Sequence, residues 1–366
     1  MALQCGIVGL PNVGKSTLFN ALTSSEIPSE NYPFCTVEPN VGIVNINDYR
    51  LDDIISFFKP NKIVKNTIEF VDIAGLVKGA SNGEGLGNQF LSQIRQVETI
   101  IHVVRCFEDH NITHVEKSVD PIRDVELIDT ELLMKDIEII DKKLKKAEKD
   151  SRSGSKESKQ KLDFFIALSI HCNSGKPAKL FNTPNEMIDE INQLQLLSNK
   201  EILYVANVDE NEISSKKQGK YSRKLFEYSK NQGHKTIKLC CKLEQDLSIL
   251  DDIEKNEYLK EFNLIDIGLN KLIKEAYDLL DLKTFFTGGP EEVRAWTIKK
   301  GSTAPEAAGK IHTDFQRGFI KAEIYHYNDL LNYKNELSLK EAGKIRIEGK
   351  NYIVKDGDII LFRFNV

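Results

Sequence analysis

Eight residues near the start of the chain have the types and spacing of a phosphate-binding loop. The run Gly9 to Ser16 fits the pattern Gly-x-x-x-x-Gly-Lys-Ser between a strand-like and a helix-like segment. Glycines let backbone N–H groups turn toward phosphate oxygens, and the helix directs the positive end of its dipole at them. Lys15 would neutralise the β- and γ-phosphates, both when the nucleotide binds and in the transition state of hydrolysis, which makes it a catalytic residue. The Ser16 hydroxyl would bind Mg²⁺. The predicted nucleotide contacts in this loop are Asn12, Val13, Gly14, Lys15, Ser16 and Thr17.

A second group of residues could complete a Mg²⁺ site. Asp72 directly follows the strand-like run at 67–71, the Walker B position, where its carboxylate would hold the metal through water. Gly75 would bring a backbone N–H to the γ-phosphate. Thr36 lies in a stretch without strong secondary-structure signals, and its hydroxyl would meet Mg²⁺ when the γ-phosphate is present. The predicted metal ligands are therefore Ser16, Thr36 and Asp72.

The expected base-recognition motif differs from that of GTPases. GTPases use Asn-Lys-x-Asp after a later strand, and the Asp accepts hydrogen bonds from two guanine donors. Here the strand-like run 202–206 leads into Asn207-Val208-Asp209-Glu210, which ends in glutamate. The extra methylene displaces the carboxylate, and losing a required polar partner in such a site can cost a factor of about 10⁴. We therefore expect ATP rather than GTP.

The residue that would orient the attacking water is missing. Leu76 follows Gly75, where Ras-like GTPases place a glutamine, and an aliphatic side chain cannot position water. Either hydrolysis is very slow or another polar group reaches the site. His110 and His114, in the loop after the apolar run at 100–104, are the nearest histidines. A histidine in a loop is more often solvated or structural than catalytic, so the residues alone favour that role for both.

The pattern along the chain predicts an α/β protein whose nucleotide domain is interrupted. Apolar runs alternate with helix signals up to about residue 125, as in a mostly parallel sheet covered by helices. Leu133, Ile137, Ile140, Leu144 and Ala147 then follow coiled-coil spacing. After about residue 280, Gly- and Pro-marked strands indicate a small α+β unit, with strands expected at 293–298, 352–354 and 359–364. We predict domains at 1–126 and 199–279 (nucleotide binding), 127–198 (antiparallel helical coiled coil) and 280–366. The nucleotide site should be complete without the last of these.

Composition and charge narrow the class of protein. Hydrophobic residues at 40% and charged residues at 29% are values of a globular protein. A net charge of −5 argues against attraction of nucleic acid or membrane by the whole surface and leaves only local basic patches. No secretory signal or membrane-spanning run is evident. The six cysteines, at 5, 35, 106, 172, 240 and 241, show neither metal-binding nor disulfide spacing. We expect a cytoplasmic protein.

At the level of whole motifs the chain closely resembles the Obg-like ATPase (YchF) family of P-loop TRAFAC NTPases. The resemblance covers essentially the full length and implies a C-terminal TGS domain with a β-grasp-like fold. It also implies that adenine binds at Asn207 and Val208, and that His114 replaces the missing glutamine. Asn12 stands where potassium-stimulated relatives bind K⁺, although an Asn in a tight turn is equally a structural choice. The strings that carry the resemblance are 9–16, 31–36, 72–80, 207–210 and 292–297.

The resemblance further implies a ribosome partner and a role in translation or stress. Basic residues gather near the predicted hairpin tip and could contact RNA phosphates, or could simply form a solvated helix face. We expect a slow Mg²⁺-dependent ATPase. An Obg-type GTPase switch and a non-catalytic ATP-sensing adaptor remain the alternatives. The basic residues are Lys142, Lys143, Lys145, Lys146, Lys149, Arg152, Lys156, Lys159 and Lys161.

Overall fold

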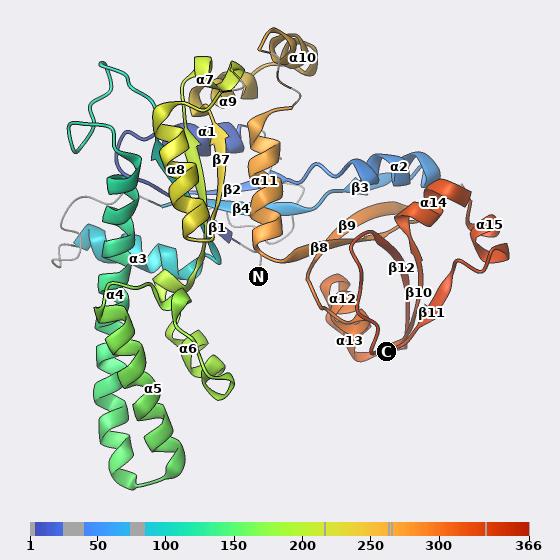
Figure 1. The fold of residues 1–366 in the computed structure, drawn as a ribbon. Coiled ribbons are helices and arrows are strands. Elements are labelled where there is room, and N and C mark those ends of the chain that lie inside the picture. The colour runs from blue at the N-terminus through green and yellow to red at the C-terminus, as the bar shows by residue number, and fades with distance from the viewer. Residues whose placement is uncertain are drawn as a thin grey trace. The chain divides into compact units, whose positions relative to one another are not determined.

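The computed structural model describes residues 4–24, 40–73, 85–215, 217–262, 264, 266–333 and 335–365. The chain forms two compact units (Figure 1). One consists of Met1–Val44 and Glu69–Leu272, and the other of Asn45–Ile68 and Ile273–Val366. No helix in the described part of the chain is both long and apolar enough to cross a membrane.

The first unit is built on a six-stranded sheet in the order β2-β4-β1-β5-β6-β7. Neighbouring strands from β4 to β7 are parallel. Every residue of β5 is buried, as expected for a strand covered on both faces. Parallel strands carry their carboxyl ends to one edge of the sheet, so the loops after them meet there. The strands are β1 (Gln4–Val8), β2 (Val41–Asn45), β4 (Thr67–Asp72), β5 (Thr99–Arg105), β6 (Glu201–Asn207) and β7 (Lys235–Leu239).

The helices that accompany this sheet follow the predicted alternation. The phosphate loop precedes α1, and short helices follow β6 and β7. The helices are α1 (Lys15–Thr23), α3 (Gly85–Gln96), α7 (Glu210–Ser214), α8 (Lys220–Asn231), α9 (Cys241–Ser248), α10 (Asp252–Glu261) and the start of α11 (Gly268–Leu279), which passes into the second unit after Leu272.

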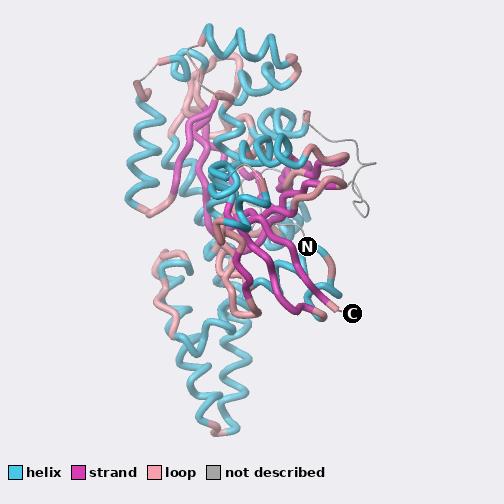
Figure 2. The backbone as a smooth tube through the Cα atoms, turned by 90° about the vertical axis from the view of Figure 1, so that its right-hand side faces the viewer, coloured by secondary structure: helices cyan, strands magenta, loops and turns pink. Residues whose placement is uncertain are grey.

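The predicted helical hairpin is confirmed as α4 (Pro121–Asp150) and α5 (Lys156–Asn173), which run side by side in Figures 1 and 2. Asp120 caps α4 and Ser155 caps α5, each with a side-chain oxygen that accepts a backbone N–H. Between them Gly154 has φ 78°, which lets the chain reverse. The seam is apolar: Ile140, Ala147, Phe164, Phe165, Leu168 and Cys172 are buried in it, and Leu133, Ile137 and Leu144 pack against them.

After α5 the chain returns to the sheet through short turns and one helix. Asp136 of α4 anchors this return, because its carboxylate accepts from the N–H groups of Leu197 and Ser198 at 2.8 and 2.7 Å. The segment contains η4 (Ala178–Leu180), η5 (Asn185–Met187), α6 (Ile188–Leu194) and η6 (Leu197–Asn199).

The second unit holds a mixed six-stranded sheet in the order β11-β10-β12-β8-β9-β3. β12 pairs with β8 in parallel, whereas β8 with β9 and β10 with β12 are antiparallel. The predicted strand at 352–354 is reduced to a single bridge between Ile353 and Thr303. The elements are β3 (Lys62–Val64), β8 (Leu282–Thr287), β9 (Glu292–Lys299), β10 (Phe319–His326), β11 (Arg346–Glu348), β12 (Asp358–Phe364), α2 (Tyr49–Phe58), α12 (Ala304–Ile311), α13 (Thr313–Arg317), α14 (Tyr327–Tyr333) and α15 (Glu336–Glu341).

Two segments differ from the sequence-based expectation. Residues 45–68 and 273–279, expected within the nucleotide domain, belong to the second unit. Leu51 and Ile54 of α2 are buried in one core with Phe286 and Val293, and β3 pairs with β9. A chain ending near residue 279 would leave the apolar side of α2 without these partners. The last part of the chain is therefore not a simple appendage.

Candidate functional site

The predicted phosphate loop leads from the carboxyl end of β1 into α1, whose first residue is Lys15. Gly14 has φ 97°, and a Cβ there would lie 2.3 Å from Nδ2 of Asn207. A Cβ on Gly9 would lie 2.7 Å from the carbonyl oxygen of Val103. Glycine is therefore required at both positions, by close packing and, at Gly14, also by the left-handed backbone. This is the geometry that lets a loop wrap an anion with its N–H groups.

Asn207, the last residue of β6, connects three parts of this edge of the sheet. Its Nδ2 donates to the carbonyl oxygen of Val13 at 2.8 Å, and its Oδ1 accepts from the N–H of Cys241 at 3.0 Å. The residue is 4% exposed. An amide nitrogen has two hydrogens, so one remains for a further acceptor such as a base nitrogen. The side chain thus holds the phosphate loop to the start of α9.

The side chains of Lys15 and Asp72 form an ion pair at the foot of α1. They are 12% and 19% exposed, so the pair is mostly shielded from solvent. Ser16 lies exposed in the first turn of α1. A hydroxyl and a carboxylate beside a phosphate loop are the hard oxygen ligands that Mg²⁺ prefers. The described residues contain no group of three or more His, Cys, Asp or Glu side chains that could hold a metal, so a cation here would also need nucleotide oxygens and water.

The loop that follows β5 is held against the phosphate loop. Arg105, at the end of β5, is 2% exposed. Its guanidinium donates to the carbonyl oxygens of Phe107, Ile112 and Asp109 at 3.2, 3.0 and 3.2 Å. Nδ2 of Asn12, in the phosphate loop, donates to the carbonyl oxygen of Thr113 at 3.1 Å. His114 is the next residue in the chain. Its backbone therefore lies close to the phosphate loop.

His114 itself is turned inward. The side chain is 5% exposed, and Nε2 lies 2.9 Å from Oδ2 of Asp124 in α4. Nδ1 accepts from the N–H of Glu116 at 3.0 Å, which leaves the ring proton on Nε2, facing the carboxylate. Arg123 donates to the other oxygen of Asp124 at 2.9 Å. Both ring nitrogens are thus occupied within the loop and α4, and His114 must leave Asp124 before it can act on a water.

The residues expected near the base lie at the ends of β6 and β7. Glu210 is the first residue of α7, and its Oε1 lies 3.1 Å from Nζ of Lys242. The N–H of Val208 donates to the carbonyl oxygen of Leu239 at 2.8 Å, and the residue is 1% exposed. The carboxylate of Glu210 therefore already has a cationic partner.

Cys240 and Cys241 form the start of α9 beside Asn207. Both are buried, and burial raises the pKa of each thiol. They remain neutral thiols, and Cys241 serves through its backbone N–H.

The predicted residues that the structure describes come from segments far apart in the chain and gather at the carboxyl edge of the first sheet. Direct bonds join Lys15 to Asp72, Asn207 to Val13, and Asn12 to the residue before His114. His110 is exposed. Thr36 and Gly75, with Cys35 and Leu76, lie outside the described residues.

Three residues of this edge were not predicted. Arg105 supports the loop, Asp124 engages His114, and Lys242 pairs with Glu210. A signal for the first was present, since an arginine that ends a wholly buried strand needs several hydrogen-bond partners. Lys242 lies on an exposed helix surface, where charged residues are common. Asp124 is buried in the first turn of α4, but an aspartate is common in the first turn of any helix and indicates no partner by itself.

Comparisons with known proteins show the family of this chain. Residues 4–146 match a family described as 50S ribosome-binding GTPase, and residues 282–365 match the YchF-GTPase_C family, described as a protein of unknown function. The chain is 50% identical to the ribosome-binding ATPase YchF of Bacillus subtilis and 47% identical to that of Escherichia coli O157:H7, over the full length of both chains in each case. The solved structure of the Schizosaccharomyces pombe YchF GTPase is 38% identical, with a TM-score of 0.90 over 99% of this chain and 97% of that one. The chain belongs to the YchF family, and its nucleotide domain has the P-loop GTPase fold.

Proposed function

We propose that this protein is a slow, Mg²⁺-dependent P-loop ATPase that prefers ATP to GTP and acts on cytoplasmic ribosomes as a regulator of translation or stress responses. The observation that carries the proposal is the phosphate loop, with its two required glycines and the Lys15–Asp72 pair at the same edge of the sheet. Its relatives in Bacillus subtilis and Escherichia coli are named ribosome-binding ATPases.

The phosphate and metal part of the proposal rests on charge. The triphosphate would be met by the ammonium of Lys15 and by N–H groups at the start of α1, where the helix dipole favours anions. When Mg²⁺ is bound, Asp72 would turn from Lys15 to the metal shell, and Ser16 would contribute its hydroxyl. Lys15 is then free to neutralise the phosphate oxygens, which is how positioned charges accelerate phosphoryl transfer. Potassium, if it binds at Asn12, would compete with the bond from that side chain to Thr113.

The preference for ATP rests on the surroundings of Glu210. Guanine needs a carboxylate that accepts from two of its donors, and Glu210 is paired with Lys242 instead. Burying two guanine donors unpaired costs about 1–3 kcal/mol for each group. Adenine has no N1–H donor and does not need this carboxylate, and its edge can accept the remaining hydrogen of Asn207.

We expect ATP to bind at least about tenfold more tightly than GTP, a difference of about 1.4 kcal/mol. Calorimetric titrations of both nucleotides at the same Mg²⁺ and salt concentrations measure it. The matched variant is Glu210→Asp, which shortens the carboxylate and should narrow the gap by strengthening GTP. Equal dissociation constants in the wild type would refute the preference and favour the Obg-type GTPase alternative.

The hydrolytic step rests on His114. Within the described residues, the bonds that hold its ring are those to Asp124 and Glu116. A shift of the loop held by Arg105 would therefore carry the imidazole toward the phosphate loop. Once there, Nδ1 or Nε2 could orient or deprotonate a water. The histidine would thereby take the role of the glutamine of Ras-like GTPases, which Leu76 cannot perform. The inward position of His114 in this structure is also the observation that favours the adaptor alternative, in which ATP binds without turnover.

His114→Ala is expected to lower single-turnover hydrolysis by about 100-fold, the lower end of the range for general acid–base groups, with ATP affinity within about twofold. His110→Ala, an exposed histidine of the same loop, is the control and should behave as the wild type. Unchanged turnover in a folded His114→Ala protein would remove the residue from the mechanism. Absence of turnover in the wild type would favour the adaptor.

Ribosome binding would use the tip of the helical hairpin. Lys142, Lys143, Lys145, Lys146, Lys149, Arg152, Lys156 and Lys159 are exposed, while Lys161 pairs with Glu157 and Glu190. Exposed basic side chains gathered in this way can bind the phosphates of rRNA, and the affinity of the protein for ribosomes should fall steeply as the salt concentration rises.

A triple variant of Lys145, Lys146 and Lys149 to Gln should reduce ribosome pelleting with a non-hydrolysable ATP analogue by about tenfold at physiological salt, because three phosphate contacts are lost. The matched control changes three exposed lysines on other helices, Lys224, Lys230 and Lys260, in the same way. Equal pelleting of the two variants would place the ribosome contact elsewhere.

A further inference from the structure

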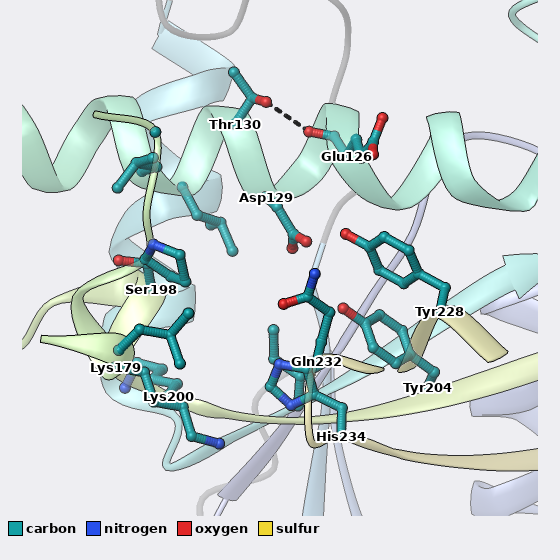
Figure 3. A pocket seen from close by; sticks show the side chains of 16 residues that line it. Glu126, Asp129, Thr130, Lys179, Ser198, Lys200, Tyr204, Tyr228, Gln232 and His234 are labelled. Atoms are coloured by element: carbon teal, nitrogen blue, oxygen red, sulfur yellow. Dashed lines mark hydrogen bonds between the residues drawn. The ribbon is translucent and has the colours of Figure 1, made fainter. Parts of the chain in front are cut away.

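A pocket of about 270 Å³ lies in the first unit between α4, the segment after α5, and the β6 and α8 side of the sheet (Figure 3). None of its lining residues belongs to the predicted nucleotide site. Its volume is close to the lower end of the range of about 300–1,000 Å³ that is usual for small-molecule sites. The pocket is therefore large enough for a compact small molecule, and its lining indicates which kind.

The charge left uncompensated in the pocket is negative. Glu126 and Asp129 stand three residues apart on α4, so they share one face of the helix. Within the described residues, no ion pair or hydrogen bond reaches either carboxylate. The two lysines of the pocket are engaged elsewhere: Lys179 pairs with Glu201 at 2.7 Å, and Lys200 donates to the carbonyl oxygen of Arg95 at 3.2 Å.

Several polar groups that face the pocket also have no protein partner in the described part of the chain. Tyr204 is 1% exposed, and its hydroxyl makes no hydrogen bond there. Nδ1 of His234 is buried and unpaired. Figure 3 shows Tyr204, Tyr228 and Gln232 directed toward Asp129 from the opposite wall. Buried polar groups are hydrogen-bonded with few exceptions, so this convergence from separate elements marks a binding site for a polar ligand.

We propose that the pocket binds a small organic cation, an alkylammonium or alkylguanidinium compound, whose charge is met by Asp129 and Glu126. The hydroxyls of Tyr204 and Tyr228 accept its N–H groups, and the faces of these rings attract a cation. Leu132, Leu133 and Ile202 line the same pocket and cover a short methylene chain.

The charge state of Asp129 provides a second test of the proposal, the pH dependence of amine binding. Burial, and then the negative charge of Glu126, raise the pKa of Asp129 to about 7. A cation binds the ionised carboxylate, so its affinity falls as the pH drops through this value, by about tenfold between pH 8 and pH 6. Burial lowers the pKa of His234 and raises those of Tyr204 and Tyr228. The titratable and charged groups facing Asp129 are Glu126 on its own helix, Tyr204 on β6, Tyr228 on α8, His234 before β7, and Lys179 and Lys200 across the pocket.

The test is calorimetric titration of the full, nucleotide-free chain with putrescine and with agmatine, and with butane-1,4-diol and butyrate as the neutral and anionic comparisons. We expect saturable one-site binding of at least one amine and none of the diol or butyrate. Asp129→Asn, which keeps the shape and removes the charge, should weaken binding by at least about tenfold and abolish its pH dependence. Glu148→Gln, an exposed acid farther along α4, should bind as the wild type.

Tyr228→Phe removes one acceptor and is expected to weaken amine binding about threefold or more, which tests the site if Asp129→Asn does not fold. Equal amine affinity in the wild type and Asp129→Asn would overturn the proposal. So would the absence of saturable amine binding at about 10 mM, or a preference for butyrate. None of these outcomes involves nucleotide, so they leave the ATPase proposal untouched.

Discussion

Lys15→Ala is expected to weaken ATP binding by at least about 100-fold, measured by calorimetry at fixed Mg²⁺. Lys15 is the cation at the first position of α1, and a hydrogen bond to a charged group contributes about 1.5–3 kcal/mol. The variant also leaves Asp72 without its partner, so Mg²⁺ alone would have to offset the charges of this carboxylate and of the phosphates. Both effects act in the same direction, because each adds uncompensated negative charge to the site.

The matched control for this variant is Lys230→Ala, an exposed lysine at the end of α8, which should bind ATP as the wild type does. Asp72→Asn gives a second comparison: it removes the metal ligand while it relieves the charge, so it should weaken Mg²⁺–ATP more than ATP alone. Unchanged ATP affinity in a folded Lys15→Ala protein would refute the phosphate-loop assignment.

Asn207→Ala should both destabilise the first unit and weaken nucleotide binding. The carbonyl oxygen of Val13 and the N–H of Cys241 lose their partner in a site where Asn207 is only 4% exposed. Each unsatisfied buried group costs about 1–3 kcal/mol. We expect the free energy of unfolding to fall by about 2–4 kcal/mol, and ATP affinity to fall about tenfold or more because the phosphate loop is no longer held.

Asn207→Asp separates the two bonds. It keeps an oxygen for Cys241 and replaces the donor to Val13 by a second acceptor, so it should lose nucleotide affinity as strongly as Asn207→Ala. Asn231→Ala, at the exposed end of α8, is the control. Denaturant unfolding with and without ATP measures both quantities, and an Asn207→Ala protein as stable as the wild type would show that neither bond matters.

Local patterns in the sequence determined much of this protein. The phosphate loop was predictable because glycine, lysine and serine at fixed spacing between a strand and a helix have few other uses. The helical hairpin was predictable because apolar residues at steps of three and four define one face of a helix, and that face is the seam now formed by Ile140 and Ala147. The alternation of strands and helices likewise gave the class of the first sheet.

Tertiary structure alone decided how distant residues meet. Asn207 and Val13 lie 194 positions apart in the chain, and Asp72 meets Lys15 across 57. The placement of residues 45–68 in the second unit depends on the pairing of β3 with β9, which no local signal encodes.

His114 shows the same limit at the level of one side chain. Its type and loop suggested a role in hydrolysis, but the bond to Asp124 follows from the way α4 leaves the sheet. The pocket beside Asp129 likewise arises where α4, β6 and α8 come together. Spacing along the chain specifies local conformation because it acts through bonded neighbours. Contacts between distant residues depend on the order of the strands and on packing. Chains with the same local pattern could adopt different strand orders, so the pattern does not determine these contacts.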